Sequence, residues 1–240
     1  ADNTWATCGD SDNGGDDFMG PALFSADLSI FAVSTPFGLG SHLDMLHSTT
    51  FCRGIAHETA NIYWVFNSNK GSLDRYDFKV DHGPGNDDHS DGEIYRYVEG
   101  QVAGVDGTSS HLAYHGGMLY IADTGNQRIA RLDPSDATMG SAFFGDEPTL
   151  RRNMDGAELV DVVPPGTLEA PSGLEIIDDV LYVTDAAQSR LYAFDLEGAL
   201  IRTLDTDLPA GSLGGMAVGP DGMLYVTDVA GSRVFRVEPR

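Results

Sequence analysis

The sequence is poor in basic residues and has no long apolar run. It carries 14 Lys and Arg against 37 Asp and Glu in 240 residues, which gives a formal net charge of −23. Such an acidic surface repels phosphate backbones and anionic lipid, so nucleic acid is not an expected partner. A membrane-spanning helix needs about 20 apolar residues in a row, and no run approaches that length, so we expect no membrane span. The charge suits solubility and the binding of cations.

The chain also has only two cysteines, Cys8 and Cys52. They form no CxxC pair, so a structural zinc cluster and a thioredoxin-like redox pair are not expected. We predict a disulfide between them, which would tie the N-terminal arm to the first repeat as in an exported protein. Two buried thiols are the alternative. No signal peptide opens the sequence, as in a mature chain after signal cleavage and equally in a shortened one. We expect an extracellular or periplasmic location.

What the sequence does contain is abundant glycine, 29 residues, and a pattern repeated around an aromatic anchor. Each copy has a run of alternating or β-branched residues, a turn, and a second such run, which is the periodicity of strands. The turns are rich in Gly and Asp, which tolerate the positive φ of hairpins. A single sheet cannot bury both faces, whereas radially stacked sheets bury them and protect their edges. The anchors are Tyr63, Tyr120, Tyr182 and Tyr225.

Two stretches, LYIADTGNQRIARLD (119–133) and LYVTDAAQSRLYAFDLEG (181–198), resemble NHL repeats. The resemblance extends over about residues 53–238. It implies an all-β fold, namely a single β-propeller of four-stranded blades. It does not specify a function, because the similar proteins include binding scaffolds, lyases and calcium-dependent hydrolases.

Four blades are expected from the four repeats. Segments 92–100, 157–163 and 199–205 would supply the outer strands of the first three. The fourth repeat lacks an outer strand, and segment 27–33 is the candidate to supply it and close the ring. Extra strands within 134–170 would give five blades instead. With either number of blades, we expect residues 1–26 to form an acidic arm and residues 27–240 to form the propeller. We expect the protein to be a monomer.

Histidine is distributed unevenly, since all seven lie between residues 42 and 115. His42, Asp44 and His47 precede the first innermost strand, and His111 begins the next, so topology places them near the mouth of the central channel. Imidazoles with one carboxylate are a normal ligand set for zinc, copper or iron. The sequence therefore predicts a transition-metal site here, and ordinary polar loop residues are the alternative.

Two more histidines, His82 and His89, lie in an acidic connection at residues 81–92. Simple topology places it on the opposite face from His42, and the sequence leaves open whether it joins the same site. The oxygen ligands of this connection, like those of segment 8–17, could hold calcium; the carboxylates around the histidines are Asp81, Asp87, Asp88 and Asp91.

The repeat type is similar to that of peptidyl-glycine amidating lyases. That resemblance implies zinc histidines just before the innermost strands, where this chain has Arg53, Ser110, Ser172 and Gly214. The lyase zinc set is therefore not carried over. Arg53 is a candidate for binding a carboxylate-bearing substrate at the channel mouth. GxSxG and HExxH motifs are absent from the sequence.

Three functions compete. The first is a metal-binding propeller with a His/Asp site, with or without catalysis. The second is a scaffold without catalysis that binds a small molecule, a peptide, a glycan or a partner protein. The third is a calcium-dependent, lactonase-like hydrolase, which needs Asp, Asn and Glu beside the innermost strands, where the sequence offers few. The uneven histidine distribution favours the first, without specifying the metal or the reaction.

Overall fold

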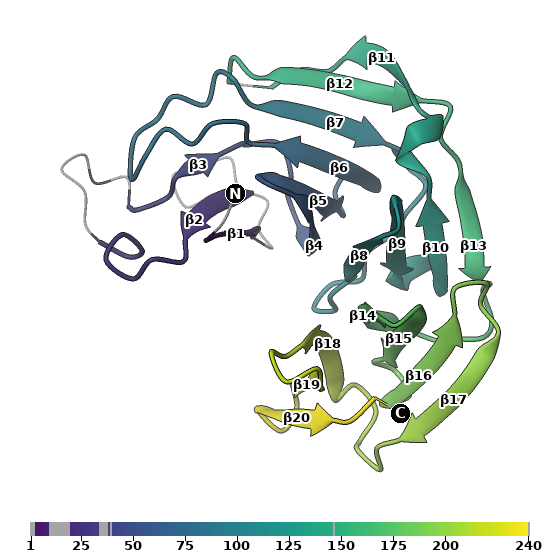
Figure 1. Ribbon diagram of the computed structural model, residues 1–240. Coiled ribbons are helices and arrows are strands. Elements are labelled where there is room, and N and C mark those ends of the chain that lie inside the picture. The colour runs from purple at the N-terminus through teal and green to yellow at the C-terminus, as the bar shows by residue number, and fades with distance from the viewer. Residues whose placement is uncertain (1–2, 10–19, 34–37, 39, 146, 240) are drawn as a thin grey trace. The chain divides into compact units, whose positions relative to one another are not determined.

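The computed structural model describes residues 3–9, 20–33, 38, 40–145 and 147–239. Contacts divide the chain into two units: residues 1–100 with 136–157, and residues 101–135 with 158–240. The strands of both are labelled in Figure 1. Each unit is built from sheets whose strands are mostly antiparallel. Among the described residues, no helix is both long and apolar enough to cross a membrane.

The first unit begins with a small antiparallel sheet near the N-terminus. It has three strands, β1 (Thr4–Thr7), β2 (Ala22–Ser25) and β3 (Asp44–Met45), in that order. A disulfide joins Cys8, just after β1, to Cys52, as predicted. Because Cys52 begins the next sheet of the unit, the bond ties the two sheets together covalently.

That next sheet has six strands in the order β11-β12-β7-β6-β5-β4. The first repeat and its outer strand account for four of them, and β12 pairs with β7 in parallel. Fully buried aromatic side chains, including Trp64, Phe66, Tyr76 and Phe78, form its core. The strands are β4 (Cys52–Thr59), β5 (Ile62–Asn67), β6 (Ser72–Asp77), β7 (Glu93–Tyr97), β11 (Thr138–Ala142) and β12 (Leu150–Asp155).

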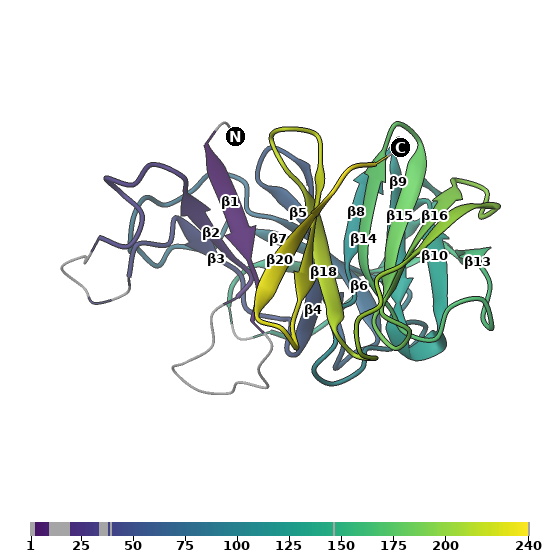
Figure 2. The same cartoon turned by 90° about the horizontal axis from the view of Figure 1, so that it is seen from below.

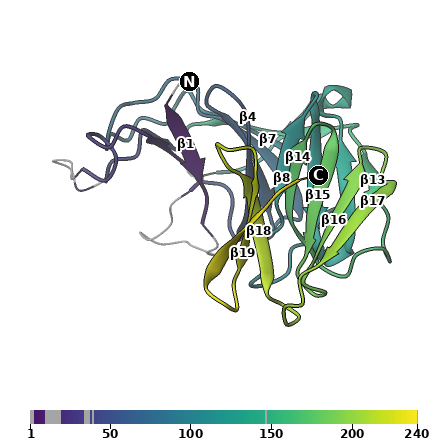
Figure 3. The ribbon, with the colours of Figure 1, turned by 60° about the horizontal axis from the view of Figure 1, so that its bottom comes forward.

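The second unit holds the three regular repeats in three sheets. Figure 3 shows the second sheet in the order β14 to β17, and Figure 2 shows strands β18 and β20 of the third. The first sheet contains β8 (Leu112–His115), β9 (Met118–Asp123), β10 (Arg128–Leu132) and β13 (Leu159–Val163). The second contains β14 (Pro171–Ile177), β15 (Val180–Asp185), β16 (Arg190–Asp195) and β17 (Leu200–Asp205). The third contains β18 (Leu213–Val218), β19 (Leu224–Asp228) and β20 (Arg233–Val237).

The predicted hairpin turns and outer strands are confirmed. Asp178 and Asp179, between β14 and β15, have φ values of 49° and 60°. Both residues are thus left-handed, as a two-residue hairpin turn that follows strand twist requires. The outer strands predicted at 92–100, 157–163 and 199–205 are β7, β13 and β17, each paired with the preceding strand of its repeat.

The prediction of four blades is wrong, and the five-blade alternative matches the five sheets. The additional sheet is β1–β3, not one formed from residues 134–170, whose strands β11 and β12 extend the first repeat's sheet. Segment 27–33 supplies no strand and forms turns instead. The Asp27 carboxylate accepts hydrogen bonds from the backbone and the hydroxyl of Ser29, both at 2.8 Å, which favours a turn over a strand.

Candidate metal centre

The backbone of residues 42–43 holds the acidic connection beside it. The Gly85 amide donates to the His42 carbonyl at 2.9 Å, and the His82 amide donates to the Leu43 carbonyl at 3.0 Å. Leu43 is buried in the core cluster that contains Tyr76, Phe78 and Ile94, so apolar packing fixes the segment from below. The connection therefore lies along His42, although simple topology placed the two on opposite faces.

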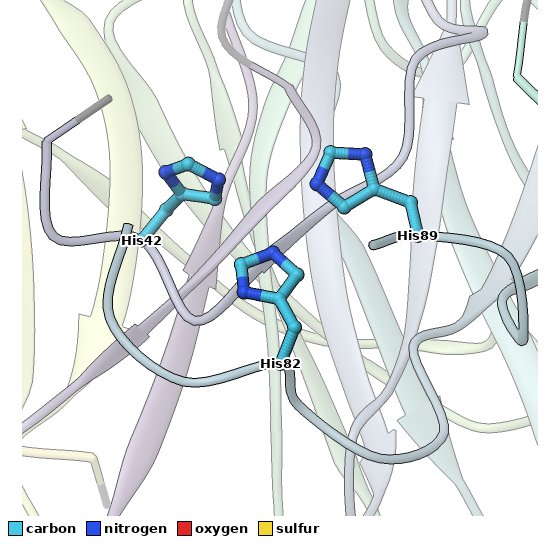
Figure 4. Close-up of side chains that lie close together, drawn as sticks. All are labelled: His42, His82 and His89. Carbon is cyan, nitrogen blue, oxygen red and sulfur yellow. The ribbon is translucent and has the colours of Figure 1, made fainter. Parts of the chain in front are cut away.

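Three histidines converge as a result. One nitrogen of each of His42, His82 and His89 lies within 4.8 Å of the others. Ring centroids are 5.1 Å apart for His42 and His82, 5.0 Å for His82 and His89, and 6.0 Å for His42 and His89. Figure 4 shows the three rings facing a common space. Tetrahedral zinc would require nitrogens roughly 3.3–3.4 Å apart, so a bound ion would draw the rings closer together.

Hydrogen bonds fix which nitrogen of two rings can bind a metal. His82 Nδ1 lies 2.7 Å from the Gly83 carbonyl, and His89 Nδ1 lies 3.1 Å from Glu147 Oε1. A carbonyl and a carboxylate only accept, so each Nδ1 carries the proton. Each Nε2 then has a lone pair, and in both residues Nε2 is buried without a hydrogen-bond partner. Since buried polar atoms are rarely left unbonded, these two nitrogens are candidates to bind a ligand.

The ionisable groups in and around the three-histidine group have shifted pKa values. Burial lowers the pKa of His82, which favours the neutral imidazole that a metal requires. Burial acts in the same direction on His89, but the hydrogen bond and charge of Glu147 outweigh it and raise the pKa of this residue. The pKa of Glu147 falls to about 2, because its bonds to His47 and His89 outweigh its burial. Burial raises the pKa of Asp44 to about 7.

The remaining predicted residues lie outside the three-histidine group. Asp44 is fully buried in β3, and its Oδ2 has no hydrogen bond, but it does not complete the group. His47 is half-exposed and bonds Glu147 through Nδ1 at 3.0 Å. Arg53 is buried in β4, with its guanidinium 5.9 Å from the Phe51 ring centroid. Of segment 8–17, residues 10–17 lie outside the described residues.

His111 belongs to the second unit and fills a packing position there. Its amide donates to the Ser172 carbonyl at 2.9 Å, and its ring approaches Gly215, where an added Cβ atom would lie 2.5 Å from Nε2. Burial lowers its pKa, so the ring is held neutral. Because Gly215 has no side chain, the His111 ring fits against it. His111 therefore packs one repeat of this unit against another.

Sequence reasoning missed Glu147 and Arg151. Glu147 lies 58 residues from His89 and 100 from His47 in the chain. Both missed residues come from the β11–β12 hairpin, which belongs to no repeat. The only available signal was the hairpin itself, an insertion within the second repeat, between its strand β10 and its outer strand β13.

Comparison with known proteins supports the fold. No family model matches the sequence and no curated protein does. An auxiliary nutrient binding protein from Bacteroides thetaiotaomicron is similar in structure, with a TM-score of 0.59 and 14% identity over 98% of this chain and 57% of that one. A streptogramin B lyase has a TM-score of 0.51 and 13% identity over 78% of this chain and 51% of that one. A catalytically inactive virginiamycin B lyase from Staphylococcus aureus with quinupristin has a TM-score of 0.53 and 13% identity over 95% of this chain and 71% of that one.

These neighbours are β-propellers, so the predicted propeller fold is supported. Because the sequence identities are only 13–14%, the similarity supports the fold and nothing about the function. This chain spans about half the length of the first neighbours, at 51% and 55% of theirs. Membership of the NHL family stays a prediction.

Proposed function

We propose that this chain is an exported metal-binding β-propeller in which His42, His82 and His89 hold one transition-metal ion. The observation that carries the proposal is the pair of buried, unbonded Nε2 atoms of His82 and His89 within the three-histidine group. Three neutral imidazoles suit zinc, copper or iron, whereas calcium prefers oxygen ligands. The Cys8–Cys52 disulfide supports an oxidising compartment.

Three protein ligands leave a coordination position for water or another group, which is the pattern of catalytic rather than structural zinc sites. Asp44 is the candidate to meet that position, because its Oδ2 is buried without a hydrogen bond and the segment that enters β3 also carries His42. Asp44 thus has the placement of an outer carboxylate that orients a molecule bound at the metal.

The test is elemental analysis of protein produced without a polyhistidine tag, stripped with a chelator and reloaded with zinc, copper or iron. One equivalent of metal per chain is expected for the native sequence. His82→Ala and His89→Ala should each lose most of it, because two imidazoles bind far less tightly than three.

Two other histidines provide matched controls. His57 Nε2 bonds the Ala60 carbonyl at 3.0 Å, and His115 Nε2 bonds Asp179 at 2.8 Å, so both are engaged elsewhere. His57→Ala and His115→Ala should keep the full equivalent. Absence of stoichiometric metal in the native chain, or equal binding in the His82→Ala/His89→Ala double variant, would overturn the proposal.

A second candidate is a binding scaffold for a small molecule, peptide or glycan. The similarity to an auxiliary nutrient binding protein covers 98% of this chain, which favours it over hydrolysis. A thermal-shift screen of sugars and short peptides, with and without metal, distinguishes the two. Ligands that act equally on the native chain and on His82→Ala would support the scaffold alone.

A further inference from the structure

The connection between β11 and β12 places one carboxylate against two histidines of the first unit. Glu147 Oε1 lies 3.1 Å from His89 Nδ1 and 3.0 Å from His47 Nδ1. Its other oxygen accepts the His47 amide at 3.0 Å. A carboxylate that accepts several charge-assisted bonds is held in one orientation.

Only one of those two histidines belongs to the three-histidine group. The side chain of His89 is 11% exposed and lies in the group, while that of His47 is 40% exposed and lies outside it. Glu147 therefore reaches the group through His89. The His47 side chain contacts the same oxygen as His89, Oε1, and the His47 amide donates to the other oxygen.

A buried arginine, Arg151, contacts the Glu147 oxygen that faces away from His89, which is Oε2. Arg151 Nη2 lies 3.2 Å from Glu147 Oε2, and the Arg151 side chain is 3% exposed. Its guanidinium also donates to the Glu147 and His47 carbonyls and to the Ser48 hydroxyl. Arg151 thus anchors the β11–β12 connection to the segment that follows His42 and Asp44.

The contact with His89 has a chemical consequence at the opposite ring nitrogen. Because the carboxylate accepts the proton of Nδ1, the Nε2 lone pair is available, and this atom is buried without a hydrogen bond. Carboxylates placed in this way fix the tautomer and orientation of a ligating histidine and make it more basic. A simple ion pair with Arg151 would not require the contact with His89.

We propose that Glu147 is the positioning residue of this site and that the β11–β12 hairpin serves to deliver it. This inference rests on the proposed metal function. Glu147 holds His89 as the Nδ1–H tautomer and aims Nε2 at the ion, without itself binding the metal.

Glu147→Gln is the main test, with Glu58→Gln as its control. Both carboxylates have side chains that are 12% exposed, and both bond an arginine, but Glu58 bonds Arg75 and Trp64 instead of a histidine. Zinc affinity is measured by competition with a chromophoric chelator. Glu147→Gln should weaken it about 10–100-fold, the usual effect of losing such a partner, and Glu58→Gln by less than about twofold.

The tautomer of His89 is read independently by ¹⁵N NMR of the metal-free protein. At a pH above the raised pKa of His89, where the ring is neutral, the native chain should show the Nδ1–H form, and Glu147→Ala, which removes the acceptor, should show a mixture. His47→Ala should leave both the tautomer and the zinc affinity within about twofold, because the contact of Oε1 with His89 and the contacts of Oε2 with the backbone amide of residue 47 and with Arg151 all remain.

These readouts separate the two proposals. If the native chain binds none of zinc, copper and iron, the proposed function fails, while the tautomer measurement still decides the role of Glu147. If the native chain binds zinc and both Glu147 variants keep its affinity and the Nδ1–H form, the positioning role is wrong. If Glu147→Ala does not fold, the Gln variant, which keeps the size of the side chain, decides the question by itself.

Discussion

The two units differ in how they treat buried polar atoms. Among the described residues, the second unit leaves one buried side-chain atom without a hydrogen bond, Ser212 Oγ, whereas the first unit leaves several, among them Asp44 Oδ2, His82 Nε2 and His89 Nε2. In the second unit, buried hydroxyls bond one another, as Ser110 and Thr124 do at 2.7 Å. The regular repeats thus form hydrogen bonds to nearly all of their buried polar side-chain atoms, whereas the unbonded atoms of the first unit include two nitrogens of the candidate site.

The largest expected effect tests whether the first unit also contains fully satisfied charges. Asp74 is fully buried and accepts two bonds from Arg96, at 3.0 and 2.9 Å, and further bonds from Ser72 and Asn67. Asp74→Ala would leave the buried guanidinium uncompensated and should lower the free energy of unfolding by about 3–5 kcal/mol. Urea denaturation measures the loss.

The matched variant in the second unit is Asp123→Ala. Its partner Arg128 has a side chain that is 17% exposed and also bonds Asp161 and the Gln101 carbonyl. The guanidinium keeps partners there, so the loss should be smaller, about 1–2 kcal/mol. Equal losses in the two variants would contradict the distinction.

The second prediction concerns the response of the two units to metal. At a free zinc concentration of 100 times Kd, binding to the native state alone stabilises it by about 2.7 kcal/mol. Hydrogen exchange should slow in segments 42–46 and 80–92, which carry the three histidines, and stay unchanged in β14 to β16. Equal protection in both units, or protection in neither, would contradict a metal site confined to the first unit.

Sequence patterns predicted the repeats well because alternation and hairpin chemistry are local. The strands around Tyr63, Tyr120, Tyr182 and Tyr225 all form, with their outer partners in the first three repeats. The N-terminal sheet was missed because its strands are short, β3 having only two residues, and follow no repeat. Segment 27–33 has an apolar pattern suited to a strand, but Asp27 and Ser29 capture it as a turn.

Only part of the candidate site could be predicted from the sequence. His42, His82 and His89 were chosen by residue type and uneven distribution, which needs no tertiary information. Their convergence depends on two backbone hydrogen bonds between residues 42–43 and the acidic connection. Glu147 depends on the parallel pairing of β12 with β7, a non-local contact that no local pattern encodes.

A third prediction uses Glu175, a partly buried carboxyl group in β14 of the otherwise satisfied unit. Burial raises its pKa from 4.5 to about 7, so the native state binds the proton more tightly than the unfolded chain does. Its contribution is fully favourable below about pH 4.5 and is lost as the pH rises to about 7. Glu175→Gln, which stays neutral, should gain stability over the native chain by roughly 1–3 kcal/mol near pH 8. Urea denaturation at both pH values measures the gain, which should vanish near pH 4.5; a constant difference would refute the assignment.

The smallest expected effect concerns Ser212, whose hydroxyl is, in the described part of the second unit, the buried side-chain atom that lacks a hydrogen bond. Ser212 and Ser110 are both fully buried in the second unit, but only the Ser110 hydroxyl has a partner. Ser110→Ala should cost about 1 kcal/mol, since it removes a hydrogen bond. Ser212→Ala removes a hydroxyl that is desolvated without a compensating bond, so it should be neutral or stabilising by up to about 1 kcal/mol. Thermal unfolding of the two variants in parallel checks the sign. A loss at Ser212 equal to that at Ser110 would show that the Ser212 hydroxyl has a partner, such as a bound water, and the second unit would then be fully satisfied.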